Sequence, residues 1–134
     1  MSEETTETGD MVYKLLREPE AELLERFGRF AGSPDDERDG FVHLSSAHQV
    51  AGTAAKYFAD ENVVLVALSV ESLGDALRFE ESRGGALFPH LYGAIMRAMV
   101  VSATPVAWTE NGHAFASEFA NAEVPEPEVT DSDA

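Results

Sequence analysis

The spacing of apolar and polar residues along the chain predicts several short strands. The segment 62–70 is apolar at nearly every position, so we expect a central strand that is covered on both faces. Other segments alternate apolar with polar residues, which is typical of strands with one buried face. The predicted strands are 11–16, 41–45, 62–70, 77–80, 90–92, 98–103 and 106–108.

Two helices are predicted early in the chain. Pro19 suits the first position of a helix, acidic residues follow it in the first turn, and Gly28 marks its end. Ser46 and Gln49 have the spacing of a capping box, which predicts the start of a second helix. Residues 32–40 are rich in Gly, Pro and Asp and are predicted to form a loop. This order favours a mixed α+β sheet with its helices early in the chain.

The length and composition fit one folded domain over about residues 11–119. The chain has 134 residues, of which 44% are hydrophobic, and this is enough for one core. Residues 1–10 and 120–134 are acidic and poor in large apolar side chains, so we expect disordered tails there. The chain contains no cysteine, secretory signal or long apolar segment, and the expected location is the cytoplasm.

The net charge of −16 is concentrated towards the two ends of the chain. Ten acidic residues lie in residues 1–10 and 118–134, which contain no Lys or Arg. An extended nucleic-acid surface needs clustered Lys and Arg, so we expect none, and no membrane contact either. A small phosphate-bearing ligand is compatible with this balance because one short basic pocket is enough to hold it. The sequence does not fix the oligomeric state.

Three of the predicted strands each carry two polar side chains that stand two positions apart. Successive side chains of a strand point to opposite faces, so both members of each pair share a face, with apolar residues opposite. Three such pairs in one small domain could line a single cleft. The pairs are His43 with Ser45, Arg78 with Glu80, and His90 with Tyr92.

The first two pairs each allow a functional and a structural interpretation. His43 and Ser45 run into the predicted helix start, where free backbone N–H groups favour a phosphate. Alternatively, Ser46 only caps the helix and His43 forms a hydrogen bond across the sheet. Arg78 keeps the neighbouring Glu80 ionised, which suits electrostatic stabilisation of a reacting centre. Alternatively, the two form an exposed ion pair of little energetic value.

The remaining candidates lie in the next segment of the chain. Arg83 is followed by Gly84 and Gly85 and could clamp a phosphate, or the segment is a plain loop. His90 and Tyr92 could bind a flat ring, or they are a half-buried pair satisfied by the backbone. We expect no functional metal, because the chain lacks thiols and any metal-binding histidine spacing.

Taken together, these motifs resemble those of the domain-of-unknown-function family 952. The resemblance covers about residues 11–115, and the order and spacing of the motifs make it specific. The motifs are Val12-Tyr-Lys14, Gly28-Arg-Phe30 before Gly32-Ser-Pro34, Asp39-Gly-Phe-Val-His-Leu-Ser45, Leu77-Arg-Phe-Glu80, Ser82-Arg-Gly-Gly85 and Phe88-Pro-His-Leu-Tyr-Gly93.

The fold of that family resembles the ADP-ribosyltransferase group. This implies a split, mixed, mostly antiparallel sheet with a cleft that holds NAD in other members of the group. A histidine on an early strand of that group contacts the nicotinamide-side ribose, and His43 matches it. Leu44 stands where the group commonly has a glycine, and Glu80 would act from a different place than the group's glutamate. NAD and ADP-ribose are the implied ligands, and related nucleotide or phosphate chemistry fits equally well.

The leading hypothesis is a transferase-like enzyme that acts on or binds a nucleotide-like ligand. His43 would orient a ribose or move a proton, and Glu80 would stabilise developing positive charge. A non-catalytic module that senses a small anion, and a structural or interaction protein, are the alternatives. The predicted ligand-binding residues are Ser45, Arg78, Arg83, His90 and Tyr92.

Overall fold

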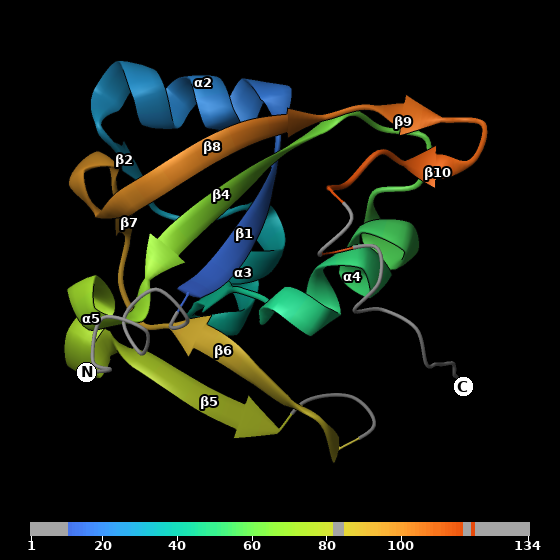
Figure 1. The fold of residues 1–134 in the computed structure, drawn as a ribbon. Helices are drawn as coiled ribbons and strands as arrows, with labels where there is room; N and C mark the ends of the chain where they lie inside the picture. The colour runs from blue at the N-terminus through green and yellow to red at the C-terminus, as the bar shows by residue number, and fades with distance from the viewer. Residues whose placement is uncertain (1–10, 82–84, 117–118, 120–134) are drawn as a thin grey trace, which may run out of the picture.

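The computed structural model describes residues 11–81, 85–116 and 119 (Figure 1). The predicted acidic tails and Arg83 lie outside these described residues. The strands are β1 (Met11–Arg17), β2 (Arg29–Phe30), β3 (Val42–His43), β4 (Val63–Ser69), β5 (Leu77–Glu81), β6 (Leu87–Leu91), β7 (Ile95–Met96), β8 (Val100–Val106), β9 (Trp108–Thr109) and β10 (Gly112–His113). The helices are α2 (Glu18–Phe27), α3 (Pro34–Asp39), α4 (Val50–Tyr57) and α5 (Val70–Leu73), with 3₁₀ turns η1 (Ala47–Gln49), η2 (Gly74–Ala76) and η4 (Arg97–Met99).

Two three-stranded sheets organise the molecule. The first has the order β1-β4-β8 and the second the order β3-β6-β5, and β2-β7 and β9-β10 form small two-stranded pairs. A bridge between Tyr13 and Ser45 connects the edges of the two larger sheets. All strand pairs among the described residues are antiparallel, so the predicted α+β fold with a mostly antiparallel sheet is confirmed.

The first sheet carries a core on each of its faces. Strand β4 lies at its centre and is mostly buried, as its apolar sequence predicts. On one face Leu24 of α2 packs with Val12 and Leu16, which are spaced to point the same way from β1. On the other face Val50 of α4 packs with Leu15. Helices α2 and α4 therefore cover opposite faces, and the second sheet extends beyond them (Figure 1).

The predicted loop at residues 32–40 contains the short helix α3 instead. Ser33 is its N-cap, Pro34 is its first residue, and Gly40 ends it in the left-handed conformation with φ of 88°. The Ser33 hydroxyl accepts from the Asp36 amide, and the Asp36 carboxylate accepts from the Ser33 amide. The loop prediction was therefore wrong. Gly, Pro, Ser and Asp are common in turns, but they also begin and end helices.

The segment that follows α3 leads into the second sheet. Only Val42 and His43 of the predicted strand 41–45 form regular ladder pairs with β6, and Ser45 instead bridges to β1. The helix start predicted at Ser46 is confirmed, because the Gln49 side chain accepts a hydrogen bond from the Ser46 amide. None of the described helices has the length and apolar character needed to cross a membrane.

Candidate functional site

The second sheet places the predicted polar residues on one face. His90 on β6 is the register partner of His43 on β3 and of Arg78 on β5. Register partners of an antiparallel pair point to the same face, so these three side chains form a row across the sheet. Glu80 and Tyr92 stand two positions from members of the row and share its face. We call this set of five residues the polar row.

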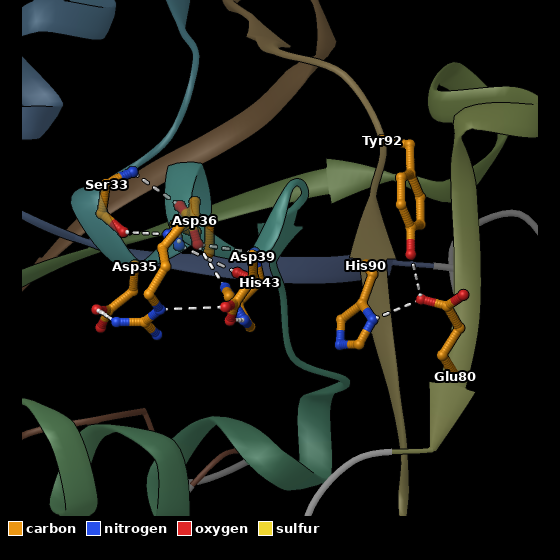
Figure 2. A network of polar contacts seen from close by, with 10 residues as sticks. Ser33, Asp35, Asp36, Asp39, His43, Glu80, His90 and Tyr92 are labelled. Atoms are coloured by element: carbon orange, nitrogen blue, oxygen red, sulfur yellow. Dashed lines mark hydrogen bonds and ion pairs between the residues drawn. The ribbon is translucent and has the colours of Figure 1, made fainter.

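A carboxylate-centred network occupies one end of the polar row (Figure 2). The Glu80 Oε1 atom lies 2.8 Å from His90 Nδ1 and accepts a 2.8 Å hydrogen bond from the Tyr92 hydroxyl. The hydrogen bonds from His90 and Tyr92 hold the pKa of Glu80 below its usual value. The same contact raises the pKa of Tyr92. Glu80 is therefore ionised at neutral pH, and the main causes are His90 and Tyr92 rather than Arg78, which the sequence analysis had named.

His90 is nearly buried and leaves one ring nitrogen without a partner among the described residues. Its residue exposure is only 5%. Because Glu80 accepts at Nδ1, that nitrogen carries the proton, and the neutral ring then presents a lone pair at Nε2. A carboxylate that fixes the tautomer of a histidine in this way prepares the other nitrogen for proton transfer.

Phe41 completes this part of the site and is a residue that the sequence analysis missed. Its ring stacks on His90 with 4.0 Å between centroids and 22° between planes. It also contacts the rings of His43 and Tyr92, at centroid distances of 4.7 and 5.3 Å. The signal that could have found it is alternation, since Phe41 stands two residues before His43 and so points to the same face.

Arg78 lies at the open end of the polar row. Its side chain is exposed, and its guanidinium carbon lies 5.5 Å from the centre of the Tyr92 ring. Such a distance is typical of a cation–π contact. The guanidinium N–H groups are therefore accessible to an anion that approaches the face of the sheet.

His43 is held between two acidic side chains of α3 (Figure 2). Its Nδ1 atom lies 2.6 Å from Asp36 Oδ1, and its Nε2 atom lies 2.9 Å from Asp39 Oδ2. Only the doubly protonated imidazolium can donate to both carboxylates at once. Both ring nitrogens are thus occupied, which leaves His43 less suited than His90 to the predicted proton transfer.

Asp36 is the buried centre of this second network. Its Oδ2 accepts from the Lys14 ammonium at 3.0 Å and from the Ser33 amide at 2.9 Å. Its Oδ1 also accepts from the His43 amide at 3.0 Å. Burial alone would raise the pKa of Asp36, but the His43 ring, the Lys14 charge and the amide donors together hold that pKa well below its usual value. The sequence analysis missed Asp36 because it sits in a run of charged residues.

Ser45 and Arg83 are not part of the assembled row. The Ser45 hydroxyl is buried and donates to Thr53 Oγ1 at 3.2 Å, while its amide donates to the Tyr13 carbonyl. The Ser46 amide is used by Gln49, so the helix start does not offer these two N–H groups to a phosphate. Arg83 lies outside the described residues. No cluster of three or more His, Cys, Asp or Glu that could hold a metal ion occurs in the part of the chain that the structure describes.

Comparison with known proteins identifies the family of the chain. A family model described as a protein of unknown function, DUF952, matches residues 15–103. The crystal structure of protein CC0527 from Caulobacter crescentus is 38% identical and has a TM-score of 0.76, covering 82% of this chain and 98% of that one. A solution NMR structure of CC0527 is 41% identical, with a TM-score of 0.69 and coverages of 77% and 90%. None of the curated proteins compared with the chain matches it. The chain therefore belongs to the DUF952 family.

Proposed function

We propose that the polar row binds a nucleotide-like ligand, such as NAD, ADP-ribose or a related phosphate, and that the protein is a transferase-like enzyme acting on it. The observation that carries the proposal is the state of His90. It is buried, it is oriented by Glu80, and its Nε2 has no partner among the described residues. Buried polar atoms normally have a hydrogen-bond partner, and a ligand hydroxyl or water at Nε2 would supply one.

The roles of the residues follow from their contacts. His90 accepts or donates a proton at Nε2, because Glu80 holds Nδ1 and leaves Nε2 for the ligand. Glu80 stays ionised and stabilises positive charge that develops on the ligand. Arg78 binds a phosphate, and the adjacent Tyr92 ring packs on a flat group of the ligand. In this proposal, these residues line a cleft of the ADP-ribosyltransferase type.

His43 has a different role in this proposal from the one expected from the sequence. Both of its ring nitrogens face carboxylates, so His43 serves to orient neighbouring side chains. In this proposal His90 carries out the proton transfer instead. The T-shaped contact between the two rings, with 5.7 Å between centroids, keeps His43 close enough to position the neighbouring ring.

Ligand binding tests the first half of the proposal. We would measure the melting temperature with and without NAD, ADP-ribose and AMP for the wild type, Arg78→Ala and Arg29→Ala. Arg29 is an exposed arginine of β2, so its loss changes the net charge equally without touching the polar row. We expect at least one ligand to stabilise the wild type and Arg29→Ala, and Arg78→Ala to lose most of that effect. Absence of stabilisation of the wild type by all three would count against a nucleotide site.

Turnover tests the second half of the proposal. The wild type, Glu80→Gln and His90→Gln would be incubated with NAD and with ADP-ribose, and the products separated by chromatography. An enzyme should lose turnover in both variants while Glu80→Gln keeps measurable binding. Binding without turnover in the wild type would instead indicate the alternative function, a non-catalytic module that senses a small anion.

A further inference from the structure

The burial of His90 differs from that of its neighbours on the same face. The side chain of His90 is 7% exposed, whereas those of His43 and Glu80 are 38% and 37% exposed. Tyr92 is also well exposed. The polar row is thus accessible except at the residue with the unpartnered nitrogen. The ring that stacks on His90 is Phe41, at 4.0 Å.

Phe41 lies on a short connection between α3 and β3. Gly40, which precedes it, has φ of 88° and ends the helix, and Val42, which follows it, is the first residue of β3. Apart from its chain neighbours, nothing would lie within 4 Å of a Cβ at Gly40, so there is open space beside this residue. The Phe41 amide donates to the Asp36 carbonyl at 3.2 Å, the longest of the contacts that hold this turn. Two residues therefore separate the end of the helix from the sheet, and Phe41 is one of them.

Two ties from His43 fasten α3 to the sheet across the turn that carries Phe41. The inner tie joins His43 to the buried Asp36 through both the ring Nδ1 and the backbone amide. The outer tie joins His43 Nε2 to Asp39, which is exposed at the end of α3. The inner tie is the shorter and the more buried of the two, at 2.6 Å against 2.9 Å. The outer tie is therefore the one that can open while His43 stays in place.

We propose that Phe41 is a movable cover over His90 and that the ion pair between His43 and Asp39 latches this cover shut. This inference rests on the proposed function, because it states how a ligand gains access to His90. In the latched state the phenyl ring occupies the face of the imidazole on which a flat group of the ligand would stack. When the latch opens, Phe41 turns away about Gly40 and the ligand takes its place.

Several charged groups surround His43 at the latch. Asp36 and Asp39 face it from α3, the Lys14 ammonium donates to its carbonyl from β1, and His90 faces it from β6. Arg38 also binds Asp39, at 3.2 Å, and competes with His43 for it. Loss of the Asp39 carboxylate removes the outer tie, while the inner tie to Asp36 remains.

The accessibility of His90 tests the cover without any ligand. Diethyl pyrocarbonate modifies accessible neutral imidazoles, and mass spectrometry of peptides would give the rate for His90 separately. We expect a low rate in the wild type, a rate several-fold higher in Asp39→Ala, and the highest rate in Phe41→Ala. Asp35→Ala is the matched control, because Asp35 is also exposed on α3 and binds Arg38 but does not contact His43. It should react like the wild type.

The two acidic substitutions on α3 test the latch. An Asp39→Ala rate equal to that of Asp35→Ala rules it out.

Two further outcomes separate the cover from the proposed function. If His90 in Phe41→Ala and in Phe41→Leu is as unreactive as in the wild type, Phe41 is not the cover; Phe41→Leu preserves apolar packing should the alanine variant unfold. If His90 becomes reactive in these variants but ADP-ribose, NAD and AMP stabilise neither them nor the wild type, the cover stands and the nucleotide function fails.

Discussion

Two carboxylates lie at the two ends of the same sheet face (Figure 2). They differ in burial and in how many hydrogen bonds they accept from the protein. Asp36 is 2% exposed and accepts hydrogen bonds from Lys14, Ser33 and both the ring and the amide of His43. Glu80 is 37% exposed and accepts from His90 and Tyr92 through one oxygen. The first carboxylate is fully used by the protein, whereas the second leaves one oxygen without a partner among the described residues.

This difference separates a structural network from a chemical one. A buried carboxylate with several donors is costly to disturb and holds its surroundings in one geometry. A half-exposed carboxylate that orients a histidine can respond to a ligand, because its remaining oxygen and the far ring nitrogen are still available. The histidine attached to Asp36 therefore fixes α3, and the histidine attached to Glu80 is the candidate for catalysis.

The largest expected effect is the loss of stability on removing Asp36. Asp36→Ala leaves the buried Lys14 ammonium without its carboxylate and removes three other contacts, to the Ser33 amide and to the amide and ring of His43. Breaking a buried ion pair by removing one partner costs about 3–5 kcal/mol, so we expect a decrease of that size in the free energy of unfolding. Urea unfolding would measure it.

The matched control is Asp35→Ala, the adjacent acid of the same helix. Its side chain is exposed and its ion pair with Arg38 is on the surface, so the expected change is within about 0.5 kcal/mol. Equal changes in the free energy of unfolding would mean that the Asp36 network stabilises the protein no more than a surface contact does.

A smaller effect is expected in the acid dependence of stability. Folding lowers the pKa of Asp36, so the folded state binds its proton less tightly than the unfolded chain does. The resulting stabilisation is complete above the unfolded value of about 3.9 and is lost as pH falls below it. Between about pH 4 and pH 2, the free energy of unfolding should fall more steeply in the wild type than in Asp36→Asn, by up to about 1.4 kcal/mol per pH unit. Parallel curves would contradict this assignment of the lowered pKa.

The sequence predicts the strands of this face better than it predicts the residues that contact one another. Alternation identified the pairs around His43, Glu80 and His90 because a strand directs every second side chain to the same face. The same rule predicted neither which strands would be neighbours nor that His90 would lie between His43 and Arg78. Those pairings depend on tertiary register, which local spacing does not determine.

Asp36 illustrates why the rest of the site could not be predicted. Four acids and an arginine occupy residues 35–39, and composition alone gives all of them a solvent-exposed position. The available signal was the capping-box spacing from Ser33 to Asp36, followed by Gly40 at the helix end. That signal predicts a helix, but burial of one acid depends on Lys14, which is 22 positions earlier in the chain.

The smallest expected effect concerns the ionisation of Tyr92. Its hydroxyl donates to the Glu80 carboxylate, and this contact raises its pKa above the ordinary value of a tyrosine. Glu80→Gln removes the negative charge, so the pKa of Tyr92 should fall, and NMR titration of ¹³C-labelled tyrosine would measure the change. Glu81→Gln removes an equal charge from the next residue of β5, whose side chain points to the other face. We expect a clear decrease in the first variant and little in the second. Equal decreases in both would show that overall charge rather than the hydrogen bond to Glu80 sets the ionisation of Tyr92.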